Sequence, residues 1–112
     1  MAEEQQKQQR IIEFQKSREQ LLSLGARKQQ LQMQLAIVDS ALGELKDSKQ
    51  EKVYKLVGNI MIEKNTKDAE KELKELKEQL ESKIDTMQKQ EDSLINRLNK
   101  LKSQIEAKEK EE

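Results

Sequence analysis

The 112-residue sequence contains no cysteine, histidine, proline or tryptophan, and it has only one tyrosine and one phenylalanine. Without thiols or imidazoles it has no cysteine nucleophile, no histidine general base, no disulfide and few of the side chains that bind transition metals. With two aromatic residues it also lacks the stacking platforms that bind single-stranded nucleic acid. We therefore expect no catalytic residues, no metal site and no cofactor.

An excess of charge of one sign and long apolar runs are missing as well. The 22 basic and 22 acidic residues sum to a net charge of zero, and no region is basic enough to predict a nucleic-acid footprint. No apolar run approaches the ~20 residues that a membrane-spanning helix needs, and the polar first ten residues do not resemble a signal peptide. We expect a soluble, cytoplasmic protein that binds neither nucleic acid nor membrane.

What the chain does contain is charge, at 39% of residues, against 33% apolar residues. Ordering each residue costs about 1–2 kcal/mol of backbone entropy, so this composition fits either disorder or a thin helical structure. Periodicity favours the second. Heptad seams predict helices over about 10–46 and 66–108 with frayed polar ends, and either Asn65 or Thr66 as N-cap of the second helix. The first seam reads Phe14, Ser17, Leu21, Leu24, Lys28, Leu31, Leu35, Val38, Leu42, Leu45; the second reads Ala69, Leu73, Leu76, Leu80, Ile84, Met87, Glu91, Leu94, Leu98, Leu101, Ile105.

Between the two blocks the pattern changes to two short runs of β-branched and aromatic residues around Gly58-Asn59. A two-residue turn with glycine supplying the positive φ predicts a β-hairpin over 52–64. In that hairpin the paired residues have numbers that sum to 117, as Val57 and Ile60 do. The polar stretch before it connects the hairpin to the first helix.

A reversal of the chain at the hairpin brings the two helical seams together. Facing residues then have numbers that sum to 118 or 119, as Val38 and Leu80 do, and this nearly constant sum is what an antiparallel two-helix coiled coil requires. The charged exceptions, Lys28 in one seam and Glu91 in the other, also face each other. They predict a polar pair that fixes the register; the alternative is that both side chains reach solvent and the match is accidental.

The predicted hairpin is apolar on both faces, and a two-stranded hairpin is only marginally stable in water. Helices leaving from one end of it cannot cover both faces and both edges, so the hairpin needs a partner sheet. Closing several hairpins into a β-barrel would remove the edges. The predicted oligomerisation residues are Val53, Tyr54, Leu56, Val57, Gly58, Asn59, Ile60, Met61 and Ile62.

The order of a long helix, the hairpin string VYKLVGNIMI at 53–62 and a second long helix resembles the beta class of prefoldin subunits. The helical segments at 26–31 and 89–92 resemble the family as well, although the hairpin string is more specific. The resemblance covers nearly the whole chain and implies one prefoldin-like domain over 1–112. It implies assembly with prefoldin alpha subunits and other beta subunits in an α2β4 hexamer. It also implies an ATP-independent holdase that binds unfolded clients at coiled-coil tips and delivers them to a group II chaperonin.

The chain ends are expected at the tip of the coil, away from the hairpin. There the seam finishes, and apolar side chains near the last layer are left partly uncovered, so we expect the client contacts in this region. For Ile11 and Ile12, the alternative is that they are ordinary exposed apolar residues with no binding role. The predicted client-binding residues are Ile11, Ile12, Phe14, Leu101 and Ile105.

Two other classes of function compete with this interpretation. An enzyme is disfavoured because carboxylates such as Glu75 and Glu78 alternate with lysines on an exposed helix face, and a two-helix coil offers no concave site. A homo-oligomeric coiled-coil scaffold or tether is the stronger rival. A scaffold, however, would have no need of a hairpin that is apolar on both faces.

Overall fold

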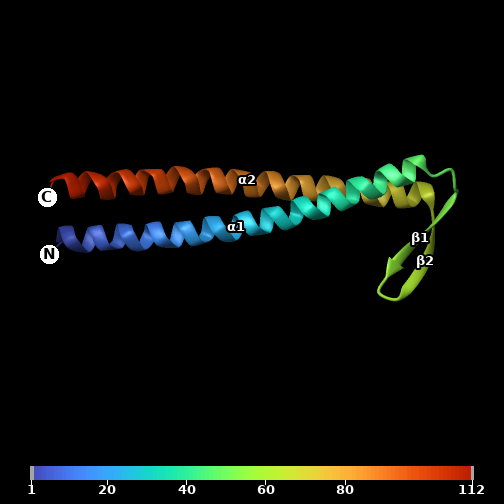
Figure 1. Ribbon diagram of the computed structural model, residues 1–112, viewed down its shortest axis with the longest axis horizontal. Coiled ribbons are helices and arrows are strands. Elements are labelled where there is room, and N and C mark those ends of the chain that lie inside the picture. The colour runs from blue at the N-terminus through green and yellow to red at the C-terminus, as the bar shows by residue number, and fades with distance from the viewer. Residues whose placement is uncertain (1, 112) are drawn as a thin grey trace. The chain divides into compact units, whose positions relative to one another are not determined.

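The structure, a computed structural model, describes residues 2–111 and consists of two long helices with a two-stranded antiparallel hairpin between them (Figure 1). This is the predicted fold class. The contacts divide the chain into two compact units, described separately below: unit 1 holds α1 up to Gln29 and α2 from Asp85, and unit 2 spans residues 30–84. The elements are α1 (Ala2–Asp47), β1 (Lys52–Val57), β2 (Ile60–Asn65) and α2 (Thr66–Glu111).

Both helices extend beyond the heptad seams into the polar ends of the chain. Helix α1 begins at Ala2 rather than near residue 10, and α2 continues to Glu111 rather than ending near residue 108. The added residues are mostly Gln, Glu and Lys, which are good helix formers, and no proline interrupts them. Met1 and Glu112, part of the ends predicted to fray, lie outside the described residues.

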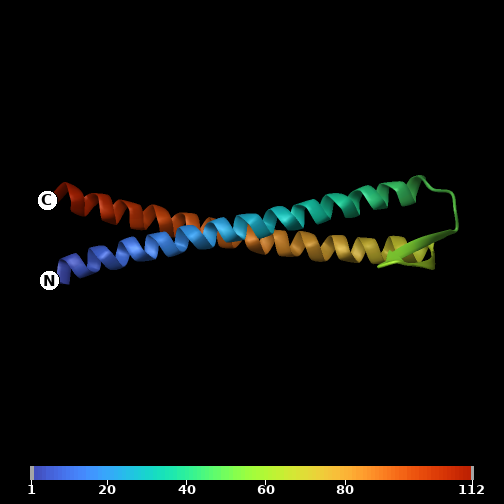
Figure 2. The ribbon, with the colours of Figure 1, turned by 60° about the horizontal axis from the view of Figure 1, so that its bottom comes forward.

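The core of unit 2 lies between α1 and α2, which run side by side there (Figures 1 and 2). Val38 and Leu80, predicted to face each other, are both buried in one cluster with Leu42. Burying a side chain of this size stabilises the fold by about 1.5–3 kcal/mol. Around this cluster pack the partly buried side chains of Leu31, Leu35 and Leu73.

Leu76 departs from the predicted seam, because 41% of its surface is exposed. The steps from Leu76 to Leu80 and from Leu80 to Ile84 are both four residues. Each such step turns the stripe by about 40° around the helix, which is the effect of a stutter in a coiled coil. With Leu80 held in the core, Leu76 is turned toward the hairpin side of the helix pair.

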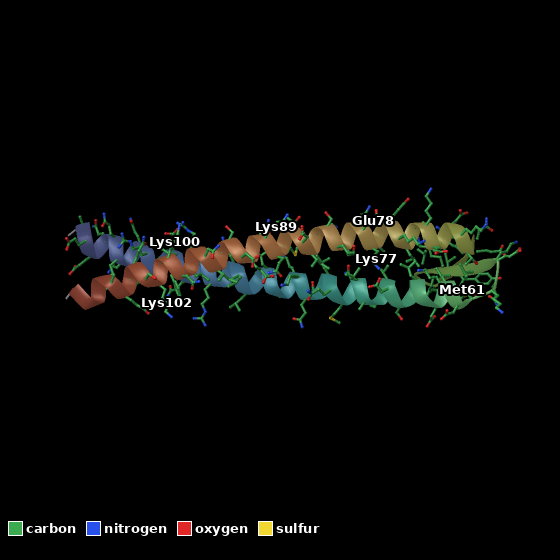
Figure 3. All side chains as sticks on the ribbon, turned by 90° about the horizontal axis from the view of Figure 1, so that it is seen from above. Met61, Lys77, Glu78, Lys89, Lys100 and Lys102 are labelled. Atoms are coloured by element: carbon green, nitrogen blue, oxygen red, sulfur yellow. The ribbon has the colours of Figure 1, made fainter. Side chains whose placement is uncertain are left out.

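An ion pair adds to the apolar packing of unit 2. The Lys77 ammonium on α2 lies 2.8 Å from an Asp39 carboxylate oxygen on α1. Figure 3 shows Lys77 directed toward α1, whereas Glu78 points away from it. Asp39 raises the pKa of Lys77 above its ordinary value, chiefly through this hydrogen bond. Both side chains are more than a third exposed, so the pair contributes little in salt.

In unit 1 the two helices are again antiparallel and end together at the chain termini (Figure 2). The described residues there include two that are almost fully buried, Ser17 on α1 and Leu101 on α2. Their numbers sum to 118, the value the seam register requires. A small serine opposite a leucine leaves room for the larger side chain to be enclosed.

The hairpin has the predicted register, in which Val57 pairs with Ile60 and Tyr54 with Glu63. Gly58 has φ of 60°, and no non-glycine residue in the described chain has a positive φ. A positive φ at the first central position alone is the pattern of a type II′ turn, which suits the twist of a two-residue hairpin.

The base of the hairpin is tied to the connector that follows α1. The Thr66 backbone N–H donates to the Glu51 carbonyl at 2.9 Å, and the Thr66 hydroxyl donates to the Gln50 carbonyl at 2.6 Å. Of the two possible N-caps, Asn65 occupies the position before the helix, and its amide donates to the Asp68 carboxylate in the first turn at 3.5 Å. Thr66 instead fastens the connector.

Candidate functional site

The hairpin carries six exposed large apolar side chains, and Figure 1 shows it projecting sideways from the helix ends of unit 2. Its sheet contains only β1 and β2, so the outer edge of each strand has no partner strand in the described part of the chain. Of the predicted oligomerisation residues, Val53 alone is half-buried, because it lies at the base. The exposed fractions are 64% for Tyr54, 67% for Leu56, 50% for Val57, 67% for Ile60, 67% for Met61 and 45% for Ile62.

These side chains lie on both faces of the ribbon. Side chains alternate along a strand, so Tyr54, Leu56 and Met61 share one face, and Val57 and Ile62 lie on the other. From Leu56 to Ile62 the hairpin contains no charged residue. A solvent-exposed, uncharged ribbon with two free edges is the usual target of further strand pairing.

One carboxylate on α2 forms ion pairs with two lysines of the hairpin. Glu72 forms ion pairs with Lys64, through a short contact, and with Lys55 at 3.8 Å. The hydrogen bond from Lys64 is the main cause that lowers the pKa of Glu72, and the positive charge of Lys55 adds to it. Heptad periodicity gave no signal of this bridge, because all three residues lie off the seams.

A groove lies between the hairpin base and the ends of the helices in unit 2. Its volume is about 570 Å³, and the bridge just described forms part of its wall. The apolar residues that line it come from α1, β1 and α2: Ala41, Leu45, Val53, Tyr54, Ala69, Leu73 and Leu76. The sequence did not predict this groove, since it arises where Leu76 leaves the seam.

The second predicted site lies in unit 1. Ile11 and Ile12 are exposed, and Phe14 and Ile105 are half-buried. Leu101 differs from the other four predicted client contacts: with 5% of its surface exposed, it offers no surface to a ligand while the helices are paired. The structure thus provides a modest apolar patch near the chain termini rather than a pocket.

Lys28 and Glu91 meet across the helices of unit 1, with the ammonium 3.1 Å from a carboxylate oxygen and side-chain exposures of 18% and 13%. Lys28 also donates a 2.8 Å hydrogen bond to the Gln88 side-chain oxygen. The Glu91 oxygen is buried, and its contact with Lys28 lacks the angles of a hydrogen bond, so we treat it as an ion pair. The pair therefore lies in the seam rather than in solvent.

The described residues contain no group of three or more His, Cys, Asp or Glu side chains placed to hold a metal ion. Among the same residues no helix is apolar over a sufficient length to span a membrane.

Comparison with known proteins matches residues 8–112 to a family described as prefoldin subunit. The chain belongs to the prefoldin subunit family. It is 38% identical over 93 residues to prefoldin subunit beta of Pyrobaculum calidifontis, covering 82% of this chain and 74% of that one. It is 33% identical over 97 residues to prefoldin subunit beta of Archaeoglobus fulgidus, covering 86% and 84%.

A solved structure agrees with these sequence relatives. The crystal structure of the prefoldin beta subunit from Thermococcus strain KS-1 superposes with a TM-score of 0.84 at 30% identity, covering 91% of this chain and 90% of that one. The predicted resemblance to the beta class is confirmed. The chain is a prefoldin chaperone subunit, and as a subunit it acts within a prefoldin assembly.

Proposed function

We propose that the chain is the beta-type subunit of an ATP-independent holdase that acts in the cytoplasm. In this role it binds non-native polypeptides and delivers them to a group II chaperonin. Family membership supports the chaperone role, and the exposed, uncharged hairpin from Leu56 to Ile62 is the observation that carries the assembly role. The work done is binding alone, so no catalytic residue or cofactor takes part.

The assembly proposed is an α2β4 hexamer with prefoldin alpha subunits, built by joining hairpins into β-barrels. Each hairpin exposes large apolar side chains on both faces, and a closed barrel covers one face and pairs both edges. A homo-oligomeric coiled-coil scaffold, the alternative, would be held together by its helices and would tolerate charge on the hairpin.

The test of assembly is a double variant, Val57→Asp with Ile60→Asp, which places two charges on one hairpin face. An unpaired charge on a buried face costs several kcal/mol, so the hexamer should be lost while the helices remain. The matched control is Met33→Asp with Ile37→Asp, which adds the same charges at exposed apolar positions on α1.

Both variants are co-expressed with an alpha-type subunit and measured by native mass spectrometry, with helix content followed by circular dichroism. We expect hexamer for the control and free subunits for the hairpin variant. A hairpin variant that still assembles at the hexamer mass would rule out the hairpin as the assembly element.

Client binding is proposed for the patch near the chain termini in unit 1. Of the residues proposed for it, Ile11 and Ile12 are exposed, Phe14 and Ile105 are half-buried, and Leu101 is buried. Non-native chains expose apolar segments of no fixed shape, so adaptable apolar surface suits them better than a pocket. Several such patches in one assembly give avidity, and each contact need only be weak.

The test replaces Ile11, Ile12 and Phe14 with Ser in the assembled protein, and a second variant removes residues 1–14 and 102–112. Both should lose most of the ability to suppress aggregation of an unfolded client while the assembly keeps its mass. Leu22→Ser, at an exposed apolar position of the same unit, is the control and should keep full capacity. If the truncated protein still suppressed client aggregation fully, the client-binding surface would have to lie elsewhere in the chain.

A further inference from the structure

The groove at the hairpin base of unit 2 is lined by apolar side chains of its own chain but is filled by none of them. Leu76 is the clearest sign: a leucine of the apolar stripe has 41% of its surface exposed and lines the groove instead of the seam. The groove volume of about 570 Å³ is large enough for several aliphatic side chains. An apolar surface of this kind at an assembly element marks a contact site for a partner.

The charges around the groove define what it accepts. Two lysines of its wall, Lys55 and Lys64, are paired with Glu72, and Glu44 lies on the α1 side. The four formal charges sum to zero, so the wall carries no net charge that would attract a segment of one sign. A neutral, apolar segment therefore suits the groove better than a charged one.

The same chain carries such a segment, the seven uncharged residues from Leu56 to Ile62. It cannot fill its own groove, because Val53 and Tyr54 at the hairpin base already line the groove. The turn lies about 13 Å further along the strand at ~3.3 Å per residue. Leu56, Ile60 and Met61 are each 67% exposed. One chain thus has an unfilled apolar groove and, separately, an uncovered apolar ribbon end.

We propose that the turn end of the hairpin of a second copy of this chain docks in this groove. The contact is heterologous, since two different surfaces meet, and repeated contacts of this kind close into a ring if the rotation allows it. This inference rests on the proposed hairpin-mediated assembly and adds to it the receiving surface: Ala41, Leu45, Leu73 and Leu76 of one copy against Leu56, Ile60 and Met61 of the next.

The absence of cysteine allows a direct test by cross-linking. Copies carrying Met61→Cys are mixed with copies carrying Leu76→Cys, assembled with an alpha-type subunit, and treated with a short bis-maleimide. A heterologous contact gives a cross-linked dimer that contains one copy of each variant. The control replaces Met61→Cys by Met33→Cys, which is similarly exposed but lies on α1, and it should give at least tenfold less mixed dimer.

A second variant measures the energy of the contact. Leu76→Asn should raise the dissociation constant for beta–beta association at least tenfold, whereas Leu22→Asn, also at an exposed leucine of a helix, should leave it within about twofold. Helix content measured by circular dichroism separates loss of association from loss of folding. The cross-linking test is independent, because it does not require the Leu76→Asn variant to fold.

The outcomes separate this inference from the proposed function. If the hexamer formed normally but the Met61→Cys copies were cross-linked only to one another, groove docking would be overturned and the assembly role would remain intact. Mixed dimers equal in yield to the Met33 control would overturn it as well. Failure of the unmodified chain to assemble at all, alone or with an alpha-type subunit, would overturn both.

Discussion

The ion pair between Lys28 and Glu91 allows a quantitative test of the seam register. Charge reversal at one position, Lys28→Glu or Glu91→Lys, places like charges where the opposite charges now lie 3.1 Å apart. At an effective dielectric constant of 20 the gross Coulomb energy at such a separation is about 5 kcal/mol. Both side chains are more than four-fifths buried, so rotation into solvent relieves only part of that repulsion.

We expect each single reversal to lower the free energy of unfolding by about 2–3 kcal/mol. The double reversal, Lys28→Glu with Glu91→Lys, restores the opposite charges, and the side-chain amide of Gln88 is able to donate to the new carboxylate. Desolvation and side-chain ordering offset most of the gross attraction, which leaves a coupling energy of about 1–2 kcal/mol. The double variant should therefore be more stable than the sum of the single effects predicts.

The assay is urea unfolding followed by far-UV circular dichroism at one fixed protomer concentration, because assembly makes apparent stability depend on concentration. The matched control is the same cycle for Asp85 and Lys89, a pair on α2 with a 3.3 Å separation and more than two-thirds exposure. That cycle should give no more than about 0.5 kcal/mol. Additivity at Lys28 and Glu91 within about 0.3 kcal/mol, or coupling no larger than in the control, would refute the seam pairing.

Three further predictions concern unit 2. Gly43→Ala should raise the free energy of unfolding by up to about 1 kcal/mol in a denaturant titration, since a Cβ there meets nothing within 4 Å, whereas Gly58→Ala should lower it because φ is +60°. Leu80→Ala should cost about 2–4 kcal/mol in the same titration, and a cost below 1 kcal/mol would contradict the observed core. The pKa of Glu72 is lowered in the folded state. The contribution of its ion pairs to the free energy of unfolding is therefore fully present above the ordinary glutamate range, and it is lost as the pH falls through the lowered pKa. Acid and Glu72→Gln should each change the fluorescence of the only tyrosine, Tyr54, and an acid response unchanged in Glu72→Gln would contradict this assignment.

Much of the architecture was predictable because the sequence patterns in different parts of the chain agree. The two seams and the turn at Gly58 give nearly the same residue sums, which fixes an antiparallel pairing before any coordinates are known. The seams also identified the facing of Val38 with Leu80 and of Lys28 with Glu91. The spacing of apolar residues predicts which positions face the other helix, because those positions are the ones buried when the helices pair.

The rest depends on geometry that periodicity does not contain. Leu76 belongs to the apolar stripe, yet the stutter turns it into a groove whose shape also depends on the hairpin base. The bridge from Glu72 to two hairpin lysines depends on where three long side chains end. Leu101 was expected to meet clients because it is near the last seam layers, but depth in the coil, rather than position along it, decides exposure.

The hydrogen bond from the Thr66 N–H to the Glu51 carbonyl also makes the hairpin an exchangeable insertion. Since these groups lie 2.9 Å apart, the fourteen residues from Lys52 to Asn65 leave and return at almost the same point of the backbone. A linker of one or two glycines, each spanning at most about 3.6 Å, is long enough to replace them. In engineering, a different β-ribbon can therefore be grafted onto the coil without changing the path of the helices, provided that it keeps the two lysines that pair with Glu72 on α2.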